Sequence, residues 1–177
     1  MDESSLVKKC IGGSQKAQRK LFEMFAPKML GVCLRYAKNK QQAEDVLQDA
    51  FIKVFTKLEL FKGGSLEGWI RRIVVNTSLD DLRKNKKRMN DSSIDGIEHK
   101  IDDKNYILEK IHAEDLLLLI NNMPDGYRAV FNMFAIEGYA HKEIAEELGI
   151  SENTSKSQYA RAKTHLQKKM KDLGIER

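Results

Sequence analysis

The side chains best suited to contact DNA lie close together near the C-terminal end of the chain. At helical spacing, one surface of the segment after Ser151 carries two cations, hydroxyls and a small residue: Lys156, Ser157, Ala160, Arg161 and Thr164. Cations and hydroxyls contact phosphates and base edges in DNA grooves, and slim side chains let a helix enter the major groove. Thr154, at the start of the segment, is expected to support the helix or to contact a phosphate. This surface predicts a helix that reads DNA.

The residues around this surface would hold the helix in place. Ser151 is a suitable N-cap, and Gly149 allows a sharp turn after an apolar helix that begins near Tyr139. This arrangement predicts a helix-turn-helix, although an ordinary amphipathic helical hairpin with a basic surface would share the pattern. Apolar residues recur every three or four positions on the other side of the second helix, which should therefore pack inward: Tyr159, Ala162, Leu166 and Met170.

The composition argues against several classes of protein. Only two prolines and few strand-like runs among 177 residues indicate an all-α fold. No apolar stretch is long enough to span a membrane, and the acidic start at residues 1–3 is unlike a signal peptide. Cys10 and Cys33 are isolated, which is typical of free thiols in a reducing cytoplasm. The four histidines lack ligand spacing, so neither a metal site nor a cofactor is expected.

Charge is distributed unevenly along the chain. Residues 62–88 hold eight Lys and Arg against three Asp and Glu, and residues 151–177 hold seven against three. The stretch between them, residues 89–125, holds three against nine. Two basic zones separated by an acidic one suggest two contacts along one polyanion, although each zone alone could be a solvated surface.

The most regular helical pattern covers residues 43–58 and has an unusual polar side. Its apolar residues follow the spacing of a buried helix face. On the other side, Glu44, Asp45, Gln48 and Asp49 crowd one surface, where like charges four residues apart weaken a helix slightly. This surface could be merely solvated, could dock a basic partner, or could hold a general acid and base. Nothing nearby suggests a cleft or a nucleophile for the last option.

Further predictions concern the ends of the other helices. Pro27 should kink or break a helix that carries Leu21 and Phe25. A helix after Ser65 begins with an apolar side that includes Trp69, and it becomes polar at Asn76. It ends in a cationic cluster that could also be a nuclear-import signal or a soluble end: Arg83, Lys84, Lys86, Lys87 and Arg88.

The chain is expected to contain two small helical domains joined by a flexible linker. Residues 89–106 lack apolar periodicity and contain Asn, Asp, Ser and Gly, which is typical of a linker. The predicted domains are residues 1–88 and residues 107–177, and the second contains the helix-turn-helix.

Two groups of residues, taken in order, resemble bacterial RNA polymerase sigma factors. Residues 43–51, 61–63, 68–76 and 83–84 resemble conserved region 2. Residues 123–124, 128–131, 143–145, 148–151 and 161–162, with Thr154, resemble region 4. The short segment between them is similar to that of the extracytoplasmic-function (ECF) sub-family, which keeps only these two regions. The chain departs from many relatives at Asn153-Thr154-Ser155, where they have Gly-Thr-Val, and at Gln158, where they have Arg.

The resemblance implies a dissociable polymerase subunit rather than an enzyme. Asp45, Gln48 and Asp49 would dock on the clamp helices of the largest polymerase subunit. In the major groove of the upstream promoter element, Lys156, Ser157, Ala160 and Arg161 would contact bases or phosphates.

The resemblance also assigns residues to the downstream promoter element. Asn76 would hold a flipped, unpaired base there, and the cluster from Arg83 to Arg88 would grip the backbone. Trp69 is expected to pack in the core rather than to stack on a base.

The resemblance implies several partners. They are core RNA polymerase, promoter DNA and, as for many members of the sub-family, an anti-sigma factor. The free protein is expected to be a cytoplasmic monomer. The main alternative is a stand-alone transcription regulator with a LuxR-like helix-turn-helix. An adaptor built on helical bundles is another, but it would need no exposed cations on the second helix.

Overall fold

The computed structural model describes residues 3–91 and 113–174, and every regular element within those two ranges is a helix. The backbone contacts divide the chain into two compact units, Met1–Leu82 and Arg83–Arg177. The predicted all-α fold with two helical domains is confirmed.

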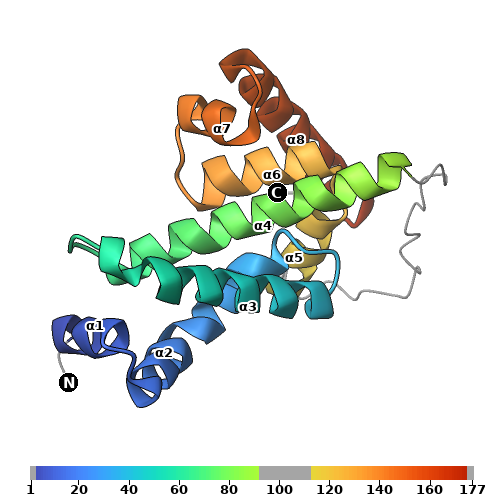
Figure 1. Ribbon diagram of the computed structural model, residues 1–177. Helices are drawn as coiled ribbons and strands as arrows, with labels where there is room; N and C mark the ends of the chain where they lie inside the picture. The colour runs from blue at the N-terminus through green and yellow to red at the C-terminus, as the bar shows by residue number, and fades with distance from the viewer. Residues whose placement is uncertain (1–2, 92–112, 175–177) are drawn as a thin grey trace. The chain divides into compact units, whose positions relative to one another are not determined.

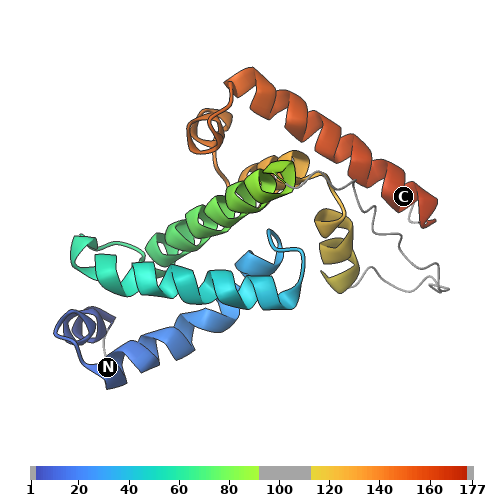
Figure 2. The same ribbon diagram turned by 45° about the vertical axis from the view of Figure 1, so that its right-hand side comes forward.

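The first unit is built from α1 (Glu3–Ile11), α2 (Gln15–Leu34), α3 (Lys40–Lys57), the short 3-10 turn η1 (Leu58–Leu60) and the first part of α4 (Leu66–Asp91). Figures 1 and 2 both show α2 and α3 running side by side, with α4 along the other flank of α3. Phe51 of α3 is 2% exposed and meets Phe22 of α2 edge to face, with ring centroids 4.7 Å apart. This apolar layer orients α3, because burying its inner side leaves its polar side toward solvent.

Local capping fixes where the helices of this unit begin. Ser14 accepts a hydrogen bond from the Ala17 amide at the start of α2, and Asn39 accepts one from the Gln42 amide at 2.8 Å at the start of α3. Two polar contacts then join α3 to α4 at half-buried positions. Gln42 Nε2 lies 2.5 Å from Asp81 Oδ2, and Lys53 Nζ lies 3.4 Å from Asp80 Oδ2.

The helix break predicted at Pro27 does not occur. A single helix, α2, runs from Gln15 to Leu34 through this proline. Pro27 itself is exposed, whereas Phe25, Ala26 and Met29 are buried. Burial of these flanking side chains keeps the segment helical even though proline removes one backbone hydrogen bond, because tertiary packing can override local propensity.

The second unit contains α5 (Ala113–Asn121), α6 (Asp125–Phe131), the π-helical turn η2 (Asn132–Ile136), α7 (His141–Leu148) and α8 (Glu152–Asp172). Its core includes Leu119, Ile120, Met123, Ala162 and Leu166. Tyr127, Phe131 and Met170 pack against this cluster. The inward side predicted for α8 is therefore confirmed at Ala162, Leu166 and Met170.

A buried cation supports the corner between α5 and α6. Arg128 is 1% exposed, and its Nη1 donates to the Asn121 carbonyl at 2.9 Å. Its Nη2 lies 2.8 Å from Asp125 Oδ1. Burial lowers the pKa of Arg128, and the Asp125 carboxylate opposes that shift. This arginine therefore serves the fold of the unit rather than an exposed surface.

The long helix α4 ends at Asp91 and so includes the first residues of the segment predicted as a linker. Residues 92–112, which make up the rest of that segment and the predicted start of the second domain, lie outside the described residues. The boundaries at residues 88, 89 and 107 therefore stay predictions.

Candidate nucleic-acid interface

The predicted helix-turn-helix is formed by α7 and α8. Gly149 ends α7 in the left-handed conformation, with φ at 64°, which a residue without a Cβ adopts at little cost. Ser151 then caps α8, because its Oγ accepts from the Thr154 amide at 3.0 Å. Figure 2 shows α7 near the N-terminal end of α8, and its axis crosses that of α8. This arrangement leaves one long side of α8 open.

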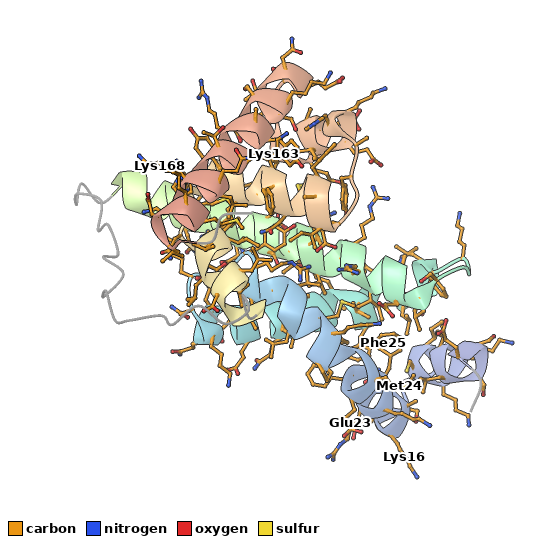
Figure 3. The ribbon with its side chains drawn as sticks, turned by 180° about the vertical axis from the view of Figure 1, so that it is seen from behind. Lys16, Glu23, Met24, Phe25, Lys163 and Lys168 are labelled. Carbon is orange, nitrogen blue, oxygen red and sulfur yellow. The ribbon has the colours of Figure 1, made fainter. Side chains whose placement is uncertain are left out.

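The predicted DNA-reading residues lie on that open side. Lys156, Ser157, Ala160 and Arg161 are all exposed, whereas Ser155 and Ala162 on the opposite side are 0% exposed. Thr154 is half-buried, and its Oγ1 lies 2.8 Å from the capping Ser151 Oγ. The structure thus brings the exposed residues together on one surface and places Thr154 in the helix start. Figure 3 shows that further along α8 its side chains include Lys163 and Lys168.

The two cations of this surface have different surroundings. Lys156 Nζ lies 2.7 Å from Glu152 Oε1, one turn earlier in α8. The hydrogen bond and charge of Lys156 lower the pKa of the Glu152 carboxyl. Within residues 3–91 and 113–174, no hydrogen bond or ion pair holds the Arg161 guanidinium. Arg161 can therefore turn toward a base with no intramolecular partner to lose.

The hydroxyl of Ser157 has only part of its hydrogen-bonding capacity in use. Its Oγ donates to the Thr154 carbonyl at 3.0 Å, which leaves the oxygen lone pairs toward solvent. In this rotamer Ser157 can accept a hydrogen bond from a base amino group, whereas donation to a phosphate would require the hydroxyl to turn.

The residues predicted to act on the downstream element lie along α4. Asn76 is half-buried, and its Oδ1 is buried with no hydrogen-bond partner among the described residues. An amide that meets a base from this position must first rotate outward. Arg83 and Lys84 are exposed, whereas the side chains of Lys86, Lys87 and Arg88 lie outside the described residues.

Trp69 lies near the start of α4. It is half-buried with its ring centroid 5.6 Å from that of Phe61, as expected for packing rather than for free stacking.

The residues predicted to dock on polymerase are exposed together on one helix, and their docking role stays a prediction. Asp45, Gln48 and Asp49 are exposed on α3, while Val46, Leu47 and Ala50 between them are buried. A shallow groove of about 550 Å³ between α2 and α3 adjoins them and includes Gln48. Among the residues lining this groove is Glu23, which Figure 3 labels on α2 with Met24 and Phe25.

Both cysteines are buried free thiols, as predicted. Burial raises the pKa of Cys33 to about 11, so its thiol stays protonated and unreactive near neutral pH. In the described part of the chain, no group of His, Cys, Asp and Glu is arranged to hold a metal ion. None of the described helices is both long and apolar enough to cross a membrane.

Comparison with known proteins places both units in one family. The family model of sigma-70 region 2 matches residues 21–88, and that of sigma-70 region 4 matches residues 113–166. The RNA polymerase sigma-H factor of Pseudomonas aeruginosa is 26% identical, over 97% of this chain and 95% of its own length. The ECF RNA polymerase sigma factor SigW of Bacillus subtilis is 26% identical, over 94% and 96%.

Solved structures share the fold. The sigma factor RpoE in complex with the anti-sigma factor NepR from Bartonella quintana aligns with a TM-score of 0.59 at 21% identity, covering 90% of this chain and 98% of that one. The two matched regions, the helix-turn-helix and this fold together define a transcription initiation factor of the sigma-70 class. The chain belongs to the extracytoplasmic-function (ECF) group of sigma factors.

Two residues beside the DNA-reading surface are not among those predicted from the sequence. Glu152 stands four positions before Lys156, a spacing that predicts an ion pair on a helix. His141 is one of four histidines without ligand spacing, and its Nδ1 lies 2.9 Å from Ser155 Oγ. No spacing rule would have paired these two residues, because their contact depends on the angle between α7 and α8.

Proposed function

We propose that this protein binds core RNA polymerase and directs it to promoters by reading an upstream element with α8. The observation that carries this proposal is the division of α8 into two sides. Lys156, Ser157, Ala160 and Arg161 are exposed on one side, and the other side is buried in the core of the same unit. A helix presented in this way can enter a major groove without any rearrangement of its domain.

Within the groove, the two cations have separate tasks. Arg161 contacts a guanine edge, since its guanidinium has five donors in a planar fork and no competing partner among the residues that the structure describes. Lys156 contacts a phosphate. Its ammonium group leaves the Glu152 carboxylate and binds the DNA backbone instead. Ser157 and Ala160 lie between them and allow close approach.

The acidic side of α3 docks on the clamp helices of the polymerase largest subunit. Asp45, Gln48 and Asp49 are exposed together above a buried face, so they can meet a basic surface at no cost in core packing. Like charges at Asp45 and Asp49 slightly weaken the isolated helix, and a cationic partner would relieve this repulsion.

Promoter opening is assigned to α4. Asn76 offers both a donor and an acceptor to a flipped non-template base, and its buried Oδ1 has no partner to give up within the described part of the chain. Arg83, Lys84, Lys86, Lys87 and Arg88 then contact the DNA backbone. Holding the unpaired base offsets the unstacking energy that melting requires.

The free protein is a cytoplasmic monomer that acts as an initiation factor and not as an enzyme. An anti-sigma factor controls it by covering its DNA-facing surfaces. This part of the proposal is supported by the solved complexes of related folds with the anti-sigma factor NepR and with the cytosolic domain of CnrY.

Reconstitution tests the proposal. The purified protein is mixed with bacterial core RNA polymerase and separated by size exclusion at moderate salt. We expect co-elution at a ratio of about one to one, as for a sigma subunit, and loss of co-elution for Asp45→Arg. Glu59→Arg, which reverses an exposed charge in η1, is the matched control and should co-elute. Clean separation with DNA binding retained would instead favour the stand-alone regulator.

A further inference from the structure

One polar contact inside the helix-turn-helix is not used by the function proposed above. Ser155 is 0% exposed, although it lies on the inward side of α8 together with the apolar residues Ala162 and Leu166. A buried hydroxyl is costly unless it is hydrogen-bonded.

The partner of this hydroxyl comes from the other helix of the motif. His141 is the first residue of α7, and its Nδ1 lies 2.9 Å from Ser155 Oγ. The contact therefore joins the N-terminal end of α7 to the first turns of α8. That part of α8 also carries Lys156 and Ser157, the residues directly after Ser155.

The imidazole ring is held on its other sides by aromatic residues. It stacks on Phe134 of η2 with centroids 4.2 Å apart and planes 12° apart. The ring centroid of Tyr159 in α8 lies 5.9 Å from that of His141, with 60° between the ring planes. The ring centroids of Phe134 and Tyr159 are 4.6 Å apart. Because η2, α7 and α8 all contribute to this cluster, the ring has little freedom to turn away from Ser155.

We propose that His141 and Ser155 form a positioning pair that fixes the orientation of α8 relative to α7 and thereby sets which bases α8 can read. The inference rests on the proposed function of α8 in promoter reading. An apolar pair at these positions would fill the same space but could slide and rotate, whereas a hydrogen bond of this length permits one register. A small rotation of α8 would move Lys156 and Arg161 relative to the base edges. Phosphate contacts tolerate such a movement better than bidentate base contacts do.

The test compares specific and non-specific DNA binding by holoenzyme assembled from core polymerase and the full chain. The specific probe is the duplex that unmodified holoenzyme enriches from a randomised pool, and the non-specific probe is its scrambled sequence. Ser155→Ala removes only the hydroxyl, and His141→Phe keeps an aromatic ring on Phe134 but loses Nδ1. Each variant should lower the ratio of specific to non-specific affinity by about three- to tenfold, the range expected for one net hydrogen bond.

Two controls separate positioning from stability. Ile144→Val shortens a fully buried side chain of α7 and should destabilise the unit without changing the affinity ratio. The double variant His141→Phe with Ser155→Ala should lose no more than the larger single effect, because both changes remove the same contact. If Ser155→Ala and Ile144→Val gave the same ratio of specific to non-specific affinity, the positioning role of the pair would be refuted. It would also be refuted if the losses of the two single variants added up in the double variant.

A failure of the proposed function would look different. In that case unmodified holoenzyme would enrich no sequence at all. The contact between His141 and Ser155 would then be tested by urea unfolding of the two single variants and the double variant, which requires no DNA. Non-additive midpoint shifts would support the pair, and additive shifts would reject it.

Discussion

Lys156 Nζ lies 2.7 Å from Glu152 Oε1 at the start of α8, so the cation assigned to a phosphate is paired with a carboxylate in the free protein. Both side chains are about half exposed, at 55% and 48%. DNA must therefore compete with Glu152 for this lysine, and Glu152 also places a negative charge beside the phosphates.

Removing this carboxylate should strengthen DNA binding. For Glu152→Gln we expect holoenzyme to bind promoter and scrambled duplexes about two- to fivefold more tightly, as befits an exposed ion pair. The gain should shrink with added salt, because counterions screen exposed charges. Glu146→Gln removes an equal charge from an exposed position on α7 and serves as the control. If Glu146→Gln strengthened DNA binding as much as Glu152→Gln, the change in net charge alone would explain the effect.

Shortening Arg161 and shortening Lys156 to alanine should affect DNA binding in different ways. Arg161→Ala should cost about 1–3 kcal/mol at one base position and relax specificity there, because a bidentate contact is lost. Lys156→Ala should weaken all sequences alike and lower the slope of log affinity against log salt by about one. Binding of single-base variants of the enriched duplex, measured over a range of salt concentrations, distinguishes the two. Uniform weakening by Arg161→Ala would refute its assignment to a base.

Asn76→Ala should block promoter opening without weakening the closed complex. Among the described residues, none forms a hydrogen bond with Asn76 Oδ1 that the substitution would remove, so the thermal unfolding temperature should stay close to that of the unmodified protein. Permanganate reactivity of unpaired thymines reports opening, and a filter-binding assay on duplex DNA reports the closed complex. Normal thymine reactivity in Asn76→Ala would remove this residue from the melting step.

Arg128 should matter for stability rather than for DNA contact. Arg128→Met should lower the free energy of unfolding of the full chain by about 2–4 kcal/mol, because it leaves the Asn121 carbonyl and the Asp125 carboxylate without their buried partner. Urea unfolding followed by circular dichroism measures this. Arg161→Met is the matched control, since the same change at an exposed site should cost little. Equal losses for both variants would contradict the assignment.

Periodicity predicted most of the fold. The spacing of Ala162, Leu166 and Met170 indicated the inner side of α8, and Ser151 and Gly149 indicated the turn before it, as the structure confirms. The sequence predicted a kink or a break at Pro27, and the break does not occur because burial of its neighbours outweighs the loss of one backbone hydrogen bond. A sequence window contains no information about that burial.

Some features of the candidate sites could be predicted from the sequence, and others could not. Exposure of Lys156, Arg161, Asp45 and Asp49 follows from helical spacing, so these residues could be found without a structure. The contact between His141 and Ser155 could not, because it depends on the crossing of two helices and on the two aromatic rings of Phe134 and Tyr159 around the imidazole. The roles assigned to the site residues stay predictions.

Promoter-dependent initiation tests the central claim most directly. Core polymerase, with and without the protein, is supplied with nucleotides and a linear template that carries the duplex enriched by the holoenzyme. We predict run-off transcripts that start at one position downstream of that duplex, only in the presence of the protein, and that disappear with Asp45→Arg. Tight binding of the protein to the duplex without polymerase, together with no transcript when polymerase is added, would contradict the assignment to a sigma subunit.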